Sequence, residues 1–116
     1  LGRVLSPPNG DYIAANGSAL GFGEEILYWY ETGYPLRLAL ARSRDGRTWT
    51  SHPTPVLEPG PYRSFDERAV ADPYVIRAGE FFYLFYLGQD RAARLVSLVR
   101  SAPGRRFALG IGGLSA

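Results

Sequence analysis

The amino-acid sequence predicts an all-β protein built from two similar four-stranded antiparallel sheets. Three observations lead to this prediction: an internal repeat, apolar residues without a helical period, and an abundance of residues that form turns. Of the 116 residues, 14 are Gly and 9 are Pro, and 14% are aromatic. Many tight turns between short strands require Gly and Pro in such numbers.

The repeat is found when the sequence is compared with itself at a shift that places Asn16 on Asp72. The same shift aligns Tyr30 with Tyr86, and a slightly longer shift then aligns residues 40–43 with residues 98–101. Repeating units of about 50 residues, made of short strands and turns, are typical of propeller-like arrays. In such arrays each unit is a four-stranded sheet, called a blade, and the blades stack around an axis.

The first unit is predicted to contain four strands, at residues 19–22, 26–31, 36–42 and 48–52. The segment at residues 44–47 lies between the third and fourth of these strands and contains Asp-Gly. An Asp-Gly dipeptide between two strand-like runs is a strong signal for a hairpin turn.

The second unit is predicted to contain strands at residues 74–76, 81–87 and 95–100, and the start of a fourth at residues 107–109. Gly79 lies between the first two strands and can adopt the positive φ that a hairpin turn requires. The second strand is a run of seven apolar residues, whereas a half-exposed strand would alternate with polar residues. We therefore expect a sheet that is packed on both faces, as a blade is.

Two blades share only one interface, so each would leave its outer face bare. Every uncovered aromatic side chain forgoes about 1.5–3 kcal/mol of burial, and soluble monomers seldom expose such patches. We therefore expect either further blades outside this chain or a homo-oligomer that covers the faces. The predicted organisation is one partial propeller domain over residues 1–116, with blade-like units at 12–52 and 70–109 and connectors at 1–11 and 53–69.

The amino-acid composition argues against several classes of partner and cofactor for this protein. The net charge is only +2 and all 13 basic residues are Arg, which is too little and too dispersed to indicate a nucleic-acid partner. The absence of Cys excludes disulfides and thiolate metal sites, and His52 is the sole His, so no metal or other cofactor is expected. No apolar run approaches the length of a membrane span. Because the chain does not begin with Met, we expect it to be a processed, excised or partial sequence.

Five short motifs carry a resemblance to a known group of enzymes. They are S-R-D-G-R-T-W at residues 43–49, P-V-L at 55–57, F-D at 65–66, D-P-Y-V at 72–75 and F-Y-L-F-Y-L-G at 82–88. Over residues 12 to 107 the sequence resembles the repeats of five-bladed β-propeller glycosidases, the group of arabinanases, β-xylosidases, levansucrases and invertases. The resemblance implies a partial five-bladed propeller with about two blades in this chain.

The resemblance also implies hydrolysis of glycosidic bonds by carboxylates at the inner ends of the first strands, around a central funnel. Such a pair is held about 5–5.5 Å or about 6.5–9.5 Å apart, depending on stereochemistry. The carboxylates come from different blades, so we expect the catalytic set to be incomplete in this chain. By resemblance, Asp72 is the candidate catalytic residue, as the base or as a supporting Asp. The alternative is that Asp72, which precedes Pro73, only caps a turn.

Three further residues are candidates for substrate binding. Asp66 and Glu67 lie in an insertion that the first unit lacks, where they could line a rim that binds sugar hydroxyls; the alternative is an exposed acidic loop without a ligand. Asn16 stands at the repeat position of Asp72. An amide cannot transfer a proton as a carboxylate can, but it could still hydrogen-bond a hydroxyl.

The sequence therefore predicts a carbohydrate-active protein that resembles a propeller glycoside hydrolase. Two alternatives remain open. The protein could be a non-catalytic module that binds carbohydrate or protein and self-assembles through its blades, or a structural remnant that folds but has lost its site.

Overall fold

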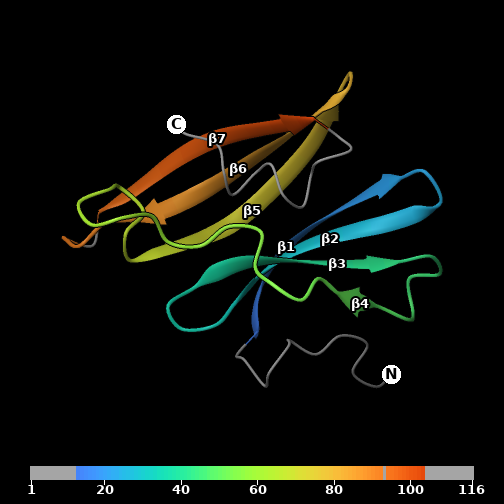
Figure 1. Ribbon diagram of the computed structural model, residues 1–116, viewed down its shortest axis with the longest axis horizontal. Helices are drawn as coiled ribbons and strands as arrows, with labels where there is room; N and C mark the ends of the chain where they lie inside the picture. Colours follow the sequence, from blue (N-terminus) through green and yellow to red (C-terminus); the bar gives the residue numbers. More distant parts are fainter. Residues whose placement is uncertain (1–12, 93, 104–116) are drawn as a thin grey trace.

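The computed structural model describes residues 13–92 and 94–103, and these residues form two antiparallel sheets and no helix (Figure 1). The order of the first sheet is β1-β2-β3-β4 and that of the second is β5-β6-β7. The strands are β1 (Ile13–Phe22), β2 (Glu25–Thr32), β3 (Arg37–Ser43), β4 (Thr50–Ser51), β5 (Ala69–Ala78), β6 (Phe81–Gln89) and β7 (Leu95–Pro103). The predicted all-β class is confirmed.

Most strands lie at the positions that the sequence predicts, but several differ from the prediction in length. The first strand of each unit is longer than predicted: β1 begins at Ile13 and β5 at Ala69. The fourth strand of the first unit is shorter, because it contains only Thr50–Ser51. The fourth strand predicted at residues 107–109 lies outside the described residues.

The first strands of the two sheets share an irregularity. The pairing register of β1 with β2 shifts between Ile13 and Gly17, and that of β5 with β6 shifts between Ala71 and Tyr74. Such shifts, as at a β-bulge, bend a strand and redirect a side chain. They explain why the sequence pattern did not extend either strand toward its beginning.

The core lies between the two sheets. Trp29, Leu40 and Phe82 are fully buried there, and the rings of Trp29 and Phe82 lie 6.2 Å apart. Phe22 adds an edge-on contact to Phe82 at 5.2 Å. Large aromatic side chains bury much apolar area each, so this interface contributes strongly to the hydrophobic stabilisation of the described residues.

The apolar strand β6 has one covered face and one open face. Phe82, Leu84 and Tyr86 point toward the first sheet and are at most 2% exposed, whereas Phe81 and Phe85 are 44% and 41% exposed. Tyr74 of the neighbouring strand β5 packs beside Phe85 and is 61% exposed. The predicted bare aromatic face is therefore confirmed for the second sheet.

The outer face of the first sheet differs from the prediction, because it is largely covered. Tyr30 is fully buried there, stacked on Tyr28 at 5.6 Å, and Trp49 meets Tyr28 edge-on at 5.9 Å. Trp49 lies on the turn that joins β3 to β4, and it donates a hydrogen bond from Nε1 to the carbonyl of Gly46. The turn thus folds an aromatic ring over a face that the repeat alone left bare.

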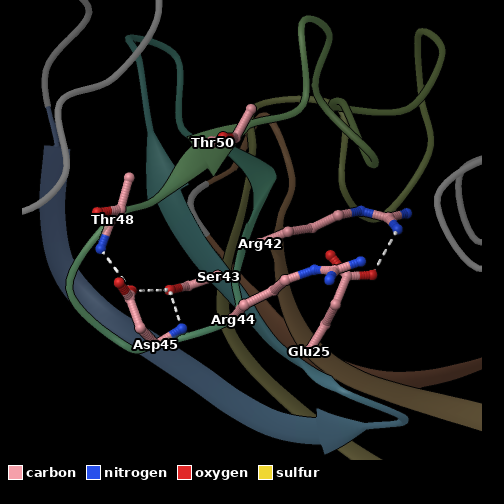
Figure 2. A pocket seen from close by; sticks show the side chains of 7 residues that line it. All are labelled: Glu25, Arg42, Ser43, Arg44, Asp45, Thr48 and Thr50. Atoms are coloured by element: carbon pink, nitrogen blue, oxygen red, sulfur yellow. Dashed lines mark hydrogen bonds and ion pairs between the residues drawn. The ribbon is translucent and has the colours of Figure 1, made fainter.

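Asp45 organises this turn (Figure 2). Its Oδ1 accepts hydrogen bonds from the backbone N–H groups of Arg47 and Thr48, both at 2.8 Å, and Ser43 Oγ accepts one from Gly46 N. Gly46 has a φ of 76°, which a residue with a side chain adopts at a cost. The backbone bonds from Thr48 and then Arg47 lower the pKa of Asp45 below 3.8, because they favour the charged carboxylate.

We expect the stabilisation by Asp45 to depend on pH. A carboxyl whose pKa is lowered by folding stabilises the protein above its unfolded pKa, and this contribution is lost as pH falls through the folded value. Asp45→Asn is therefore expected to melt below the wild type at neutral pH, and the difference should shrink once pH falls below 3.8. Thermal unfolding across this range measures it. A difference in melting temperature that stays constant with pH contradicts the assignment.

The connector between the sheets packs along the first sheet. Leu57 pairs with Leu38 of β3, and Val56 N donates to the carbonyl of Leu38 at 2.8 Å. Val70 N then donates to the carbonyl of Leu36 at 3.1 Å, which joins β5 to the loop before β3. In the part of the chain that the structure describes, no helix is long and apolar enough to cross a membrane.

Candidate functional site

Asn16 and Asp72, which the repeat aligns, meet in space. Each lies at the register irregularity of the first strand of its sheet, and Asn16 Nδ2 donates to Asp72 Oδ1 at 2.7 Å. Both residues are exposed. The strands β1 and β5 belong to the two neighbouring sheets (Figure 1) and contact each other, so irregularities at equivalent positions bring the two side chains together.

Glu31, near the end of β2, contacts both Asn16 and Asp72 and is only 3% exposed. Its Oε2 accepts a hydrogen bond from the backbone N–H of Asp72 at 2.7 Å and one from Asn16 Nδ2 at 3.4 Å. A buried carboxylate is costly unless it is hydrogen-bonded. Glu31 therefore links the two sheets and fixes the backbone of Asp72.

The backbone of Asp72 has a φ of 51°, although the residue carries a side chain and precedes Pro73. Asp tolerates the left-handed region better than most residues, but such a conformation still costs about 1–3 kcal/mol. Residues held in this way concentrate at functional sites. The bond from Asp72 N to Glu31 offsets part of the cost and orients the Asp72 carboxylate.

The arrangement of these three side chains favours the binding of a polar ligand. Asp72 offers an exposed carboxylate whose Oδ2 accepts no hydrogen bond within the described residues, and the Asn16 amide lies beside it. A carboxylate next to an amide can hydrogen-bond sugar hydroxyls, and the carboxylate can also accept a proton. Glu31 is buried and already accepts two bonds, so we assign it a positioning role.

Asp66 is buried, so the alternative of an exposed acidic loop is wrong for this residue. It is 2% exposed, and its oxygens accept hydrogen bonds from Tyr86 Oη and Ser64 Oγ, each at 3.0 Å. A Cβ at Gly60 or Gly88 would clash with Asp66, so the backbone at both glycines lies close to the Asp66 side chain. The physical reason for burial is that these partners replace water around the carboxylate.

Glu67 lies beside Asp66 and is partly buried. Its Oε2 accepts a hydrogen bond from Arg63 N at 2.9 Å, and its Oε1 lies 3.6 Å from Arg91 Nε. Neither Asp66 nor Glu67 is hydrogen-bonded to Asn16, Glu31 or Asp72 in the described structure. Their predicted substrate-binding role stays a prediction.

Glu31 is not among the residues that the sequence predicts for the site. The signal that could have found it is an acid within an apolar run, at a position where the second unit has Leu87. An acid in a predicted buried strand needs a partner. Nothing in the sequence indicated that this partner would be the backbone of Asp72 in the next sheet.

We expect Glu31→Ala to be markedly less stable than Glu31→Gln. The Ala variant leaves the N–H of Asp72 without its acceptor, at a cost of about 1–3 kcal/mol, whereas the Gln carbonyl can still accept that bond. Urea unfolding measures both variants. Equal losses for Ala and Gln would show that the hydrogen bond to Asp72 does not support the site.

A surface cavity of about 440 Å³ is lined by residues at the start of β2, at the end of β3 and in the turn that follows (Figure 2). Glu31 lies near the other end of β2, so this cavity is separate from the site. The polar side chains of the cavity largely pair with one another or with the backbone: Arg42 lies 3.5 Å from Glu25, and Asp45 is bonded within its own turn. None of the predicted site residues lines it. Among the described residues, no group of His, Asp and Glu is arranged to hold a metal ion.

Comparison with known proteins gives a fold but no sequence family. No family model matches the chain, and no curated protein matches it. Several solved structures are similar. The complex of BT0996 with RGII is 18% identical, with a TM-score of 0.70, and the match covers 84% of this chain and 29% of the BT0996 chain.

Two structures of glycoside hydrolases are also similar. A glycosyl hydrolase from Bacteroides ovatus is 20% identical with a TM-score of 0.63, and the match covers 87% of this chain and 36% of that chain. A thermostable family-43 glycoside hydrolase is 15% identical with a TM-score of 0.63, and the match covers 84% of this chain and 31% of that chain.

The chain thus spans about a third of the length of these structures. Identities of this size support the fold and leave the activity of this chain open. The fold is that of neighbouring blades from a β-propeller of the kind found in glycoside hydrolases.

Proposed function

We propose that this protein is carbohydrate-active and that its site belongs to the glycoside-hydrolase class. The observation that carries the proposal is the conformation of Asp72, an exposed carboxylate with positive φ that a buried Glu31 holds at the irregularity of β5. The structural neighbours are glycoside hydrolases, which supports the same class of substrate.

In this proposal Asp72 is either the base that accepts a proton from water or the Asp that supports another carboxylate. Asn16 hydrogen-bonds Asp72 and orients a sugar hydroxyl, and Glu31 positions the backbone. Hydrolysis needs a second carboxyl group at about 5–5.5 Å or about 6.5–9.5 Å from the first. Glu31, which the structure places next to Asp72, is buried and holds the Asp72 N–H. By the resemblance, the second carboxyl group would come from another blade.

A second candidate function is a non-catalytic module that binds carbohydrate or protein and self-assembles. Two observations favour it. Asn16 holds an amide where a catalytic unit would use a carboxylate, and Tyr74, Phe81 and Phe85 form an exposed aromatic face on the second sheet. A second copy that covers this face would bury a patch that is unusual on a monomer.

Hydrolysis and binding assays on the purified protein test these functions together. Release of nitrophenol from aryl arabinosides, xylosides and fructose-based sugars supports the enzyme, and sugar binding by calorimetry without turnover supports the module. Sedimentation then tests self-association, because a monomer at all concentrations would overturn assembly. Absence of both turnover and sugar binding would overturn the proposed carbohydrate function.

A further inference from the structure

A second cavity, of about 250 Å³, lies between the two sheets and has no part in the site described above. Its walls come from the loop between β2 and β3, from the start of β5 and from the end of β6. The lining residues are Tyr34, Pro35, Leu36, Arg68, Ala69 and Gln89. The bond from Val70 N to the carbonyl of Leu36 holds the loop against β5, so the cavity is bounded by fixed backbone.

Arg68 gives this cavity a positive charge. The guanidinium groups of Arg37, Arg42, Arg91 and Arg94 each lie within 4.0 Å of a carboxylate, at Glu58, Glu25, Glu67 and Asp90 respectively. Arg68 is exposed, and no carboxylate of the described residues pairs with it. An unpaired guanidinium presents a planar fork of donors that fits a carboxylate.

The other polar groups around the cavity suit a sugar. Arg68 N donates to the carbonyl of Gln89 at 2.9 Å, which fixes these two residues side by side. Gln89 adds an amide that can donate to and accept from hydroxyls. Tyr34 is 94% exposed and adds an aromatic surface at the edge of the cavity. Charge, amide and aromatic surface together match a sugar that carries an acidic group.

The cavity lies within reach of the candidate site. Ala69 lines it and precedes Asp72 by three residues on β5. A strand rises about 3.3 Å per residue, so the two places are about 10 Å apart along the strand. An oligosaccharide of a few units can span this distance.

We propose that this cavity, termed the Arg68 subsite, binds the carboxylate of a uronic acid unit in a sugar chain that also occupies the site at Asp72. The inference rests on the proposed carbohydrate function and adds a substrate class to it. Arg68 pairs with the carboxylate, Gln89 bonds a ring hydroxyl, and Tyr34 packs against the sugar face.

Calorimetry with digalacturonic acid and its methyl ester tests the Arg68 subsite, because the two ligands differ in charge but hardly in shape. We expect the wild type to bind the acid at least tenfold more tightly than the ester, since a charge-assisted bidentate pair is lost with the ester. Arg68→Gln should abolish this preference, and Arg68→Lys should retain only part of it. The control Arg44→Gln removes an exposed arginine at the other cavity and should leave the preference for the acid unchanged.

The outcomes separate this inference from the proposed function. Equal binding of acid and ester by the wild type overturns the Arg68 subsite, while the binding of either ligand still supports a carbohydrate site. A preference for the acid that survives in Arg68→Gln also overturns the subsite. If digalacturonate and its ester both fail to bind while an aryl glycoside is hydrolysed, the uronic acid class is wrong and the proposed enzyme stands.

Discussion

Phe82→Ala is expected to lower the free energy of unfolding by about 3–5 kcal/mol, the usual cost of removing a buried aromatic ring. Phe82 is fully buried between the sheets and contacts the rings of Phe22 and Trp29. Its removal would leave a cavity at the centre of the only large interface between the two described sheets. Urea unfolding measures the loss.

Phe85→Ala is the matched control, since Phe85 lies on the same strand and points to the other face, where it is 41% exposed. We expect a loss of about 1 kcal/mol or less, because little burial is removed. Equal losses for the two variants would show that the face of β6 that we describe as open is covered in solution. If Phe82→Ala does not fold, Phe82→Leu should still be less stable than Phe85→Leu.

Asp72→Asn is expected to reduce any glycoside hydrolysis by at least about 10²-fold, because an amide cannot accept or transfer the proton. The fold should be kept, since Asn also tolerates positive φ and its carbonyl can accept the bond from Asn16. The kcat for an aryl glycoside that the wild type hydrolyses measures the effect. If the protein binds sugars without turnover, the same substitution should weaken binding about tenfold, because a hydrogen bond to a charged group is lost.

Glu80→Gln is the control for Asp72→Asn, as it neutralises an exposed carboxylate on the turn between β5 and β6. It should change neither kcat nor sugar affinity. Asp72→Asn with unchanged activity would remove Asp72 from the catalytic role and leave it as a turn residue. Asp72→Ala is a poorer test, because Ala at a φ of 51° adds backbone strain to the lost carboxylate.

Local sequence patterns predicted the strands well where pairing is regular. The apolar run of β6 and the Asp45-Gly46 turn are both found as expected, because strand propensity and turn chemistry are local properties. The same patterns missed the beginnings of β1 and β5. At these points a register irregularity breaks the alternation, and nothing local indicated that pairing continues beyond it.

The candidate site was predicted in part. The repeat aligned Asn16 with Asp72, and the resemblance pointed to Asp72. Contact between the two side chains, however, requires the sheets to pack so that the register irregularities of β1 and β5 lie next to each other. Glu31 was not predicted, and Asp66 was placed either in a rim that binds sugar hydroxyls or in an exposed acidic loop. Both are buried acids whose partners, Asp72 N and Tyr86 Oη, are distant in sequence.

The sequence by itself determined the all-β class, and it predicted two related units and an apolar neighbour on each side of β6. It could do so because the alternation of side chains and the chemistry of turns depend on adjacent residues. Only the tertiary structure decided which aromatic faces are covered and which buried acid holds Asp72. Those outcomes depend on how two sheets dock, and docking joins residues whose separation along the chain carries no local signal.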